Sequence, residues 1–236
     1  MLIPFISNLH NMKLKYFYIF LLTVSTSNIL AQDNDKQVNI DLLKNRKQNV
    51  IKTGLFCPFW GSILLTSEYR FVYETPTSAR TSVQIGASYL AKNFWLWPII
   101  IDTLKQNNPQ ASQYTIKGFR VQLAFKYYVF KDQVAPDGLY FAPFLSYSMA
   151  SIGTPDSYLR QTYIKIVYIN ANLIMGYQFF YMNQVAIDFY FGLGIKQNSY
   201  LEYDNGKLYK RYDPADFEFI KTPLKIVMGV NIGLGF

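Results

Sequence analysis

Apolar and polar residues alternate one by one along most of the chain from residue 50 onward. The stretch GFRVQLAFKYYVF is the clearest case, because its apolar residues are separated by Arg120, Gln122, Ala124 and Lys126. The final stretch KIVMGVNIGLGF alternates in the same way and ends on Phe236. A period of two residues is the signature of a β-strand with one apolar face. The chain is therefore predicted to be built from strands.

The alternation predicts eight strands. They lie in NVIKTGLF, SILLTSEYRFVYE, TSVQIGASY, GFRVQLAFKYYVF, GLYFAPFLSYSM, INANLIMGYQF, VAIDFYFGLGIK and KIVMGVNIGLGF. Short connections are expected near residues 74–78, 131–137 and 181–184, and longer ones at 91–113, 153–162 and 202–221. The connection CPFWGS is the exception, because it is brief although it lies at the end that carries the longer connections. An even strand number with short turns at one end and long loops at the other is typical of outer-membrane barrels.

Two residues qualify this strand pattern. Ile63 is expected on the same apolar face as Tyr69 and Phe71, although Ser67 interrupts that face. Pro143 lacks the N–H group that a sheet ladder needs, so a bulge or local irregularity is expected in its strand.

The composition helps to decide which face points outward. Only 16% of the residues are charged and 18% are aromatic, against about 25% charged in soluble domains. The polar faces are rich in glycine and small polar residues, which suit the crowded interior of an eight-stranded barrel. We expect the apolar faces, including Val121, Phe189 and Ile232, to contact lipid. A soluble exported lipid-binding barrel of opposite orientation is the alternative.

In that orientation, several charges lie inside the barrel. Glu68, Arg70, Arg120, Lys126 and Asp188 are expected to form a polar network in the lumen, because an unpaired buried charge is costly. Separate, hydrated charges are the alternative. A lumen filled with side chains is not a general diffusion pore, which leaves a narrow channel or transport-associated barrel as the competing function.

The N-terminal region carries the features of a secretory signal. Lys13 and Lys15 precede the apolar run YFYIFLLTV, and Ala31 offers a cleavage site. Residues 1–31 are thus predicted to be a cleaved signal peptide, 32–48 a periplasmic lead-in and 49–236 the barrel. Ile29 fits the cleavage pattern poorly, and a buried N-terminal helix is the alternative. Met12 opens the pattern, which makes residues 1–11 a candidate over-extended start.

Few residues offer catalytic chemistry. The single histidine, His10, precedes the cleavage site, so a mature chain lacks the Ser-His-Asp arrangement. An enzyme acting on envelope lipid would have to work without histidine, and we expect no enzymatic activity and no cofactor. Cys57 is expected to be a packing residue. The acidic loop with Asp213, Asp216 and Glu218 could bind a divalent cation, but a solvated loop without metal is preferred.

The loop NFWLWPIII is unusually apolar for a connection. Phe94, Trp95 and Trp97 are expected to extend an interfacial aromatic belt, with a short helix over 98–105 near the lipid. The alternative is a docking patch for a protein partner or hydrophobic ligand. The basic residues are scattered, which gives no support to a nucleic-acid site, although some could contact anionic lipid head groups.

These stretches together resemble a family of small eight-stranded outer-membrane barrels found in Gram-negative bacteria of the Bacteroidota type. The resemblance rests on NVIKTGLFCPFWGSILLTSEYRFVY, IGASY, GFRVQLAFKYYVF, GLYFAPFLSY, IMGYQF and the glycine-rich final strand. It implies an OmpA-like transmembrane β-barrel in the cell outer membrane, surrounded by lipid, and we expect the barrel to be a monomer. It also implies that the barrel-assembly machinery recognises the last strand through Val230, Ile232, Leu234 and Phe236.

Overall fold

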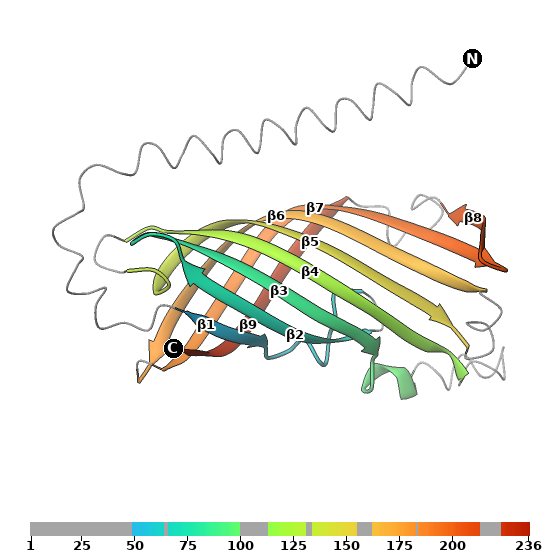
Figure 1. Cartoon of the computed structure of the whole chain (residues 1–236), viewed down its shortest axis with the longest axis horizontal. Coiled ribbons are helices and arrows are strands. Elements are labelled where there is room, and N and C mark those ends of the chain that lie inside the picture. Colours follow the sequence, from blue (N-terminus) through green and yellow to red (C-terminus); the bar gives the residue numbers. More distant parts are fainter. Residues whose placement is uncertain are drawn as a thin grey trace, which may run out of the picture. The chain divides into compact units, whose positions relative to one another are not determined.

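Nine β-strands account for most of the described chain (Figure 1). The computed structural model describes residues 49–63, 66–99, 113–130, 134–154, 162–182, 184–212 and 223–236. All of them fall in one unit, Arg46–Phe236. The strands are β1 Val50–Gly54, β2 Thr66–Pro76, β3 Thr81–Lys92, β4 Thr115–Tyr128, β5 Gly138–Gly153, β6 Tyr163–Tyr181, β7 Val185–Asp204, β8 Lys207–Tyr212 and β9 Leu224–Gly235.

Eight of these strands close into an antiparallel barrel. Each strand from β1 to β7 pairs with the next along the chain, and β9 completes the ring between β7 and β1. The closing register sets Val50 against Gly235. The predicted eight-stranded up-and-down barrel is confirmed. β8 stands outside the ring and pairs with β7.

The two ends of the barrel differ. One, which we call the turn end, holds the tight connections and both ends of the barrel sequence, where Asn49 and Phe236 exchange backbone hydrogen bonds of 3.1 and 2.9 Å. The opposite loop end has an uneven rim. β6 and β7 are 19 and 20 residues long, whereas β1 has 5 residues and β2 has 11. The wall is therefore tall at β6–β7 and low at β1–β2.

Several strand boundaries differ from the sequence prediction; β6, for example, begins at Tyr163 rather than Ile169. β1 ends at Gly54 rather than continuing through Phe56, because the chain turns there, with the Trp60 N–H bonded to the Phe56 carbonyl. The expected loop at 202–221 is wrong in its first half, since β7 continues to Asp204 and β8 follows. Asn205 and Gly206 form the connecting turn with φ of 48° and 76°, the left-handed conformation that a two-residue hairpin turn requires.

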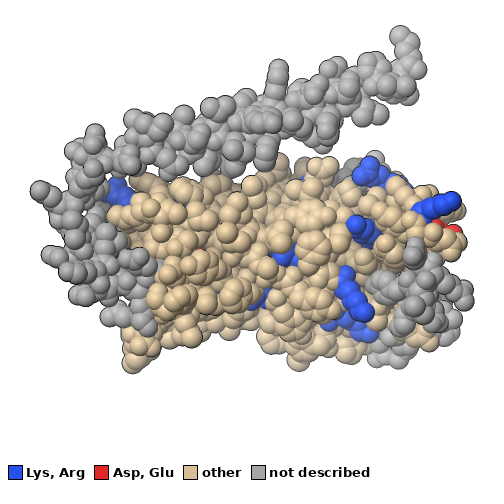
Figure 2. Space-filling model, in the orientation of Figure 1, with Lys and Arg blue, Asp and Glu red and all other residues tan. Residues whose placement is uncertain are grey.

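The orientation of the alternating faces is as predicted. Val121, Phe189 and Ile232 expose 47%, 48% and 39% of their surface on the outer wall, whereas Arg120 and Asp188 expose 3% and 0%. Figure 2 shows a wall almost free of charge, with lysine and arginine gathered toward the end that carries β8. The barrel therefore has an apolar exterior and a polar, charged interior.

An apolar cluster occupies the lumen near the loop end. Inward residues of β3 to β7, among them Leu90 and Ile116, pack around Ile63 and Trp97 from two connections. Ile63 was predicted on the outer apolar face and is instead buried, because β2 begins only at Thr66 and Ile63 belongs to the preceding connection, where it packs into this cluster. The mouth of the barrel is thus partly filled from within.

The ladder at Pro143 is locally interrupted, as predicted. Pairing between β4 and β5 stops at Ala124–Phe144 and resumes at Tyr127–Phe141 in the same register. Several other predictions fall outside the described residues. These are the signal peptide 1–31, the lead-in 32–48, the acidic trio Asp213, Asp216 and Glu218, and the helix expected over 98–105 beyond Ile99.

Candidate functional site

The lumen near the turn end holds a closed ionic network, which we call the turn-side network: Lys52, Glu74, Lys126, Gln178 and Asp188. The Lys52 ammonium pairs with Glu74 and lies 2.9 Å from Asp188. The Lys126 ammonium lies 3.1 Å from Glu74 and 3.0 Å from Asp188. Both lysines also donate to the Gln178 carbonyl oxygen, at 2.8 and 2.9 Å. Two cations and two carboxylates thus balance, and all four side chains are buried.

Two tyrosines complete the turn-side network. Tyr128 donates to Glu74 at 2.8 Å and Tyr140 donates to Asp188 at 2.6 Å. Their rings lie 5.6 Å apart, and the Lys126 ammonium sits 4.0 Å from the Tyr140 ring centre. Both are fully buried, so the ionic layer and these rings together close the lumen at this level.

A second group lies nearer the loop end, and we call it the loop-side group: Glu68, Arg70 and Arg120. The Glu68 carboxylate accepts from Arg70 at 2.8 Å and from Arg120 at 3.1 Å. Ser88 donates to the same carboxylate at 2.8 Å. This group carries two cations and one anion, so its charge does not balance.

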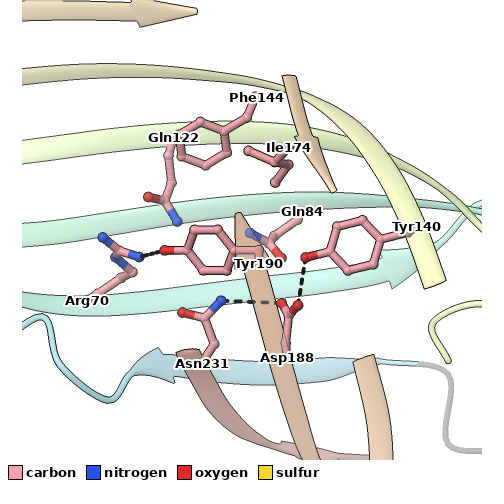
Figure 3. Close-up of a pocket in the computed structure, with 9 residues that line it drawn as sticks. All are labelled: Arg70, Gln84, Gln122, Tyr140, Phe144, Ile174, Asp188, Tyr190 and Asn231. Carbon is pink, nitrogen blue, oxygen red and sulfur yellow. Dashed lines mark hydrogen bonds between the residues drawn. The ribbon is translucent and has the colours of Figure 1, made fainter. Parts of the chain in front are cut away.

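A small cavity separates the two groups (Figure 3). Tyr190 reaches across it toward Arg70, whose guanidinium donates to the Tyr190 oxygen at 3.0 Å, and Asn231 donates to Asp188 at 3.3 Å on the far side. The cavity offers about 10 Å³ to the centre of a water molecule, enough for about one water. The loop-side group lies on one side of this cavity and the turn-side network on the other, so the cavity is not part of a continuous passage through the lumen.

The five residues predicted for a lumen network all point inward, but they divide between the two groups. Glu68, Arg70 and Arg120 form one group, and Lys126 and Asp188 belong to the other. The sequence analysis missed Lys52, Glu74 and Gln178, and it did not place Tyr128 or Tyr140 in the lumen. The alternation in their strands assigns all five to the inward face, which was the available signal.

The aromatic loop does not act as one unit. Asn93 caps a helical turn at 96–99, where its side-chain oxygen accepts from the Trp95 and Leu96 N–H groups at 2.9 and 2.7 Å. Trp97 is 7% exposed within the apolar cluster, whereas Trp95 is 63% exposed. The Phe94 ring contacts that of Phe59 in the first connection, 5.7 Å between centres. The loop thus presents Phe94 and Trp95 outward and buries Trp97.

The last strand keeps its alternation to the end. Ile232, Leu234 and Phe236 are exposed on the outer wall, and Val230 is half-buried in the same row. Each of these residues is also held in the barrel by its backbone. Recognition of this row by an assembly machinery stays a prediction.

The β7–β8 hairpin extends past the apolar wall. Its strand β8 is exposed along its length and carries Lys207, Lys210 and Arg211. Near its base the Tyr212 hydroxyl donates to Glu202 at 2.6 Å, and this hydrogen bond to the carboxylate raises the pKa of Tyr212. The hairpin is thus a polar, basic projection.

Other chemistry is sparse in the described part of the chain. Among these residues no three His, Cys, Asp or Glu side chains are placed to hold a metal ion. Cys57 is a free, half-buried thiol that packs over Gly54. None of the described helical segments has the length and apolar character needed to span a bilayer.

No protein-family model and no curated protein matches the chain. Among solved structures, the chain is similar to a major outer membrane protein from Thermus thermophilus. That similarity has a TM-score of 0.44 at 11% sequence identity and covers 80% of this chain and 99% of the other.

Proposed function

We propose that the protein is an integral outer-membrane barrel with a structural or surface-interaction role and a closed lumen. The observation that carries the proposal is the inside-out arrangement of polarity: charges are buried in the lumen while aromatic and aliphatic side chains cover the wall. In water this arrangement would expose a large contiguous apolar surface, which soluble monomers avoid. A soluble lipid-binding barrel would need the reverse orientation.

The height of the apolar wall supports the same proposal. On β7 the outward residues are apolar from Val185 to Ile195, and Gln197 is the first polar one. About ten residues at ~3.4 Å each make ~34 Å of strand. At a tilt of about 40° this becomes ~26 Å, close to the ~25 Å apolar band of outer-membrane barrels. The turn end would face the periplasm and the loop end the exterior.

The lumen supports a role other than diffusion. The turn-side network and its two tyrosines fill the bore with buried side chains, and both ions and solutes would have to break paired charges to pass. Under this proposal the protein acts through its outer wall and its exposed loop end, where the β7–β8 hairpin offers a surface for contacts. A non-enzymatic role without a cofactor is part of the proposal.

Fractionation of cells expressing the full chain tests the location. The protein should remain in the outer-membrane pellet after sodium carbonate extraction, float with liposomes, and migrate faster unboiled than boiled on a denaturing gel. The purified barrel should leave planar bilayers silent. Release into the carbonate supernatant would contradict the membrane location, and steady single-channel conductance would contradict the closed lumen.

A further inference from the structure

The barrel wall is incomplete on one side of the loop end. β1 pairs with β9 only from Val50 to Gly54, against Gly235 to Asn231. The last bond between these segments joins the Leu55 N–H to the Val230 carbonyl at 2.9 Å. Figure 1 shows β1 ending well short of β2 and β3. Beyond that point β9 pairs, in the described part of the chain, with β7 alone.

The uncovered half of β9 has an open edge. The backbone of Phe236 pairs toward Asn49 beside β1, and backbone groups alternate sides along a strand. The N–H and C=O groups of Met228 and Ile226 therefore point toward the side on which β1 pairs. They lie beyond the end of β1, so β1 does not reach them. Inward-facing Lys225, Val227 and Gly229 are half-exposed here. Among the described residues, the inner face of β9 is thus partly accessible from the side at this edge.

Positive charge without a counter-charge gathers behind the open edge. Lys225 interacts electrostatically with Arg70, Arg120 and Lys196 and with one carboxylate, Glu68. Arg70 and Arg120 pair with Glu68, so the four cations of this region face one carboxylate and leave a surplus of three positive charges. Neither the Lys196 nor the Lys225 ammonium has a hydrogen bond or ion pair with any described residue. Lys196 and Lys225 are half-buried, and cations partly withdrawn from water beside further positive charge favour the binding of an anion.

A buried amide lies across β7 from Lys225 in the sheet. The β-sheet register places Asn172, Gly194 and Lys225 side by side on β6, β7 and β9. Asn172 is 7% exposed, and neither its side-chain nitrogen nor its oxygen has a protein partner. The Nε of Arg120 is buried without a partner as well. Unpartnered hydrogen-bonding groups and positive charge therefore lie on neighbouring strands, and the Asn172 side chain occupies the space over Gly194.

The location of this cluster indicates its ligand. Lys225 follows Leu224, which lies opposite Ile195 at the upper limit of the apolar wall. Just outside the open edge, Leu224, Ile226 and Met228 are among the exposed apolar side chains. Cations at the polar rim next to an apolar strip match a molecule with a phosphate head and acyl chains.

We propose that this opening binds the phosphate of a membrane lipid, with the head group on Lys196, Lys225 and Asn172 and the acyl chains against the outer face of β9. Arg70 and Arg120 contribute positive charge from behind, since two nitrogens of each already donate to Glu68, Tyr190 or Ser146. The proposal rests on the membrane location proposed above. It assigns a lipid site to the loop-side lumen.

Native mass spectrometry of the full chain folded in micelles of a zwitterionic detergent tests the site. The probes are dioleoyl phosphatidic acid, dioleoylglycerol, which lacks the phosphate, and inorganic phosphate, which lacks the chains. We expect phosphatidic acid to bind at one site per barrel and the other two to bind at least about tenfold more weakly. Equal binding of dioleoylglycerol would overturn the role of the cations. Equal binding of inorganic phosphate would overturn the assignment to lipid.

Matched variants locate the binding. Lys196→Gln with Lys225→Gln should weaken phosphatidic acid by about tenfold or more, because two charge-assisted contacts are lost. Lys165→Gln with Lys207→Gln removes the same charge from the outer surface and should leave the affinity unchanged. Asn172→Asp is nearly isosteric and supplies an internal carboxylate, so it should also weaken binding. Unchanged affinity in both site variants would overturn the proposal.

Gel mobility and liposome flotation of every variant keep the two proposals apart. A barrel that floats and is heat-modifiable but does not prefer phosphatidic acid contradicts the lipid site alone. A wild-type chain that fails to float contradicts the membrane location itself.

Discussion

Lys126 and Asp188 lie on strands separated by two others around the wall, yet their side chains meet in the lumen with Nζ 3.0 Å from Oδ2. Their side chains are 0% and 1% exposed. An ion pair that crosses the bore ties distant parts of the wall together. It also fills the space through which a solute would otherwise pass.

Removing one member of this network should cost more than removing a surface charge. Asp188→Asn leaves Lys52 and Lys126 facing only the Glu74 carboxylate, and we expect a loss of roughly 3–5 kcal/mol in the free energy of unfolding. Urea titration of the barrel refolded into lipid vesicles measures it. The matched variant Asp204→Asn, at the exposed end of β7, should change stability by less than about 0.5 kcal/mol. Similar values for both variants would contradict a coupled ionic layer.

Tyr128 and Tyr127 offer a matched pair for the closed lumen, since Tyr128 is fully buried in the bore and Tyr127 faces outward. Tyr128→Ala should admit water beside the ionic layer and produce measurable ion conductance in planar bilayers, where we expect the wild type to be silent. Tyr127→Ala should stay silent. Conductance of equal size in the wild type, or in Tyr127→Ala, would show that another path carries the ions.

The two tryptophans of the aromatic loop should behave differently. Trp97→Ala creates a cavity in the apolar cluster and should lower the free energy of unfolding by about 3–5 kcal/mol. Trp95→Ala removes an exposed ring and should leave it within about 0.5 kcal/mol. Urea titration of both variants distinguishes them. Equal losses would mean that Trp95 also contributes to the folded barrel.

The role of the Phe236 side chain can be tested separately from the role of its backbone, which helps to close the barrel. The backbone of Phe236 pairs with Asn49, and this pairing survives in Phe236→Ala, while its exposed ring is lost. We therefore expect refolding into detergent to be nearly normal and the amount assembled in the outer membrane of cells to fall several-fold. Equal loss in both assays would point to a packing role for the ring instead of recognition.

The alternation was enough to predict the barrel and the direction in which its side chains point, because a strand has only two faces. The outward direction of Val121 and the inward direction of Arg120 follow from their odd and even positions in the strand alone. Parity does not reveal which inward residues meet, since that depends on how far each strand is shifted against its neighbours around the ring. The sequence analysis therefore treated Lys126 and Arg120 as one network, whereas the register places them in separate layers.

The sequence signals of β8, of the buried Trp97 and of the early end of β1 were weak or were misinterpreted. The Asn205–Gly206 pair is a strong hairpin signal, but the expectation of a long loop outweighed it and β8 was overlooked. Trp97 was grouped with Trp95 because aromatic residues near a membrane were expected to face lipid. Only the tertiary packing of Ile63 and Leu90 around it explains why its ring turns inward. The alternation of apolar and polar residues does not indicate that β1 ends early, and so it does not indicate the open edge of β9.

The account depends most on whether the outer row of side chains is bathed in hydrocarbon, and spin labelling tests this directly. Phe189→Cys and, as its inward neighbour, Tyr190→Cys are each labelled in a Cys57→Ser background and reconstituted in lipid vesicles. Power-saturation electron paramagnetic resonance should report a label at 189 that is highly accessible to oxygen and shielded from a water-soluble nickel chelate, whereas the label at 190 should be immobile and shielded from oxygen. A label at 189 that the nickel chelate reaches freely, or that is more buried than the label at 190, would contradict the proposed membrane barrel.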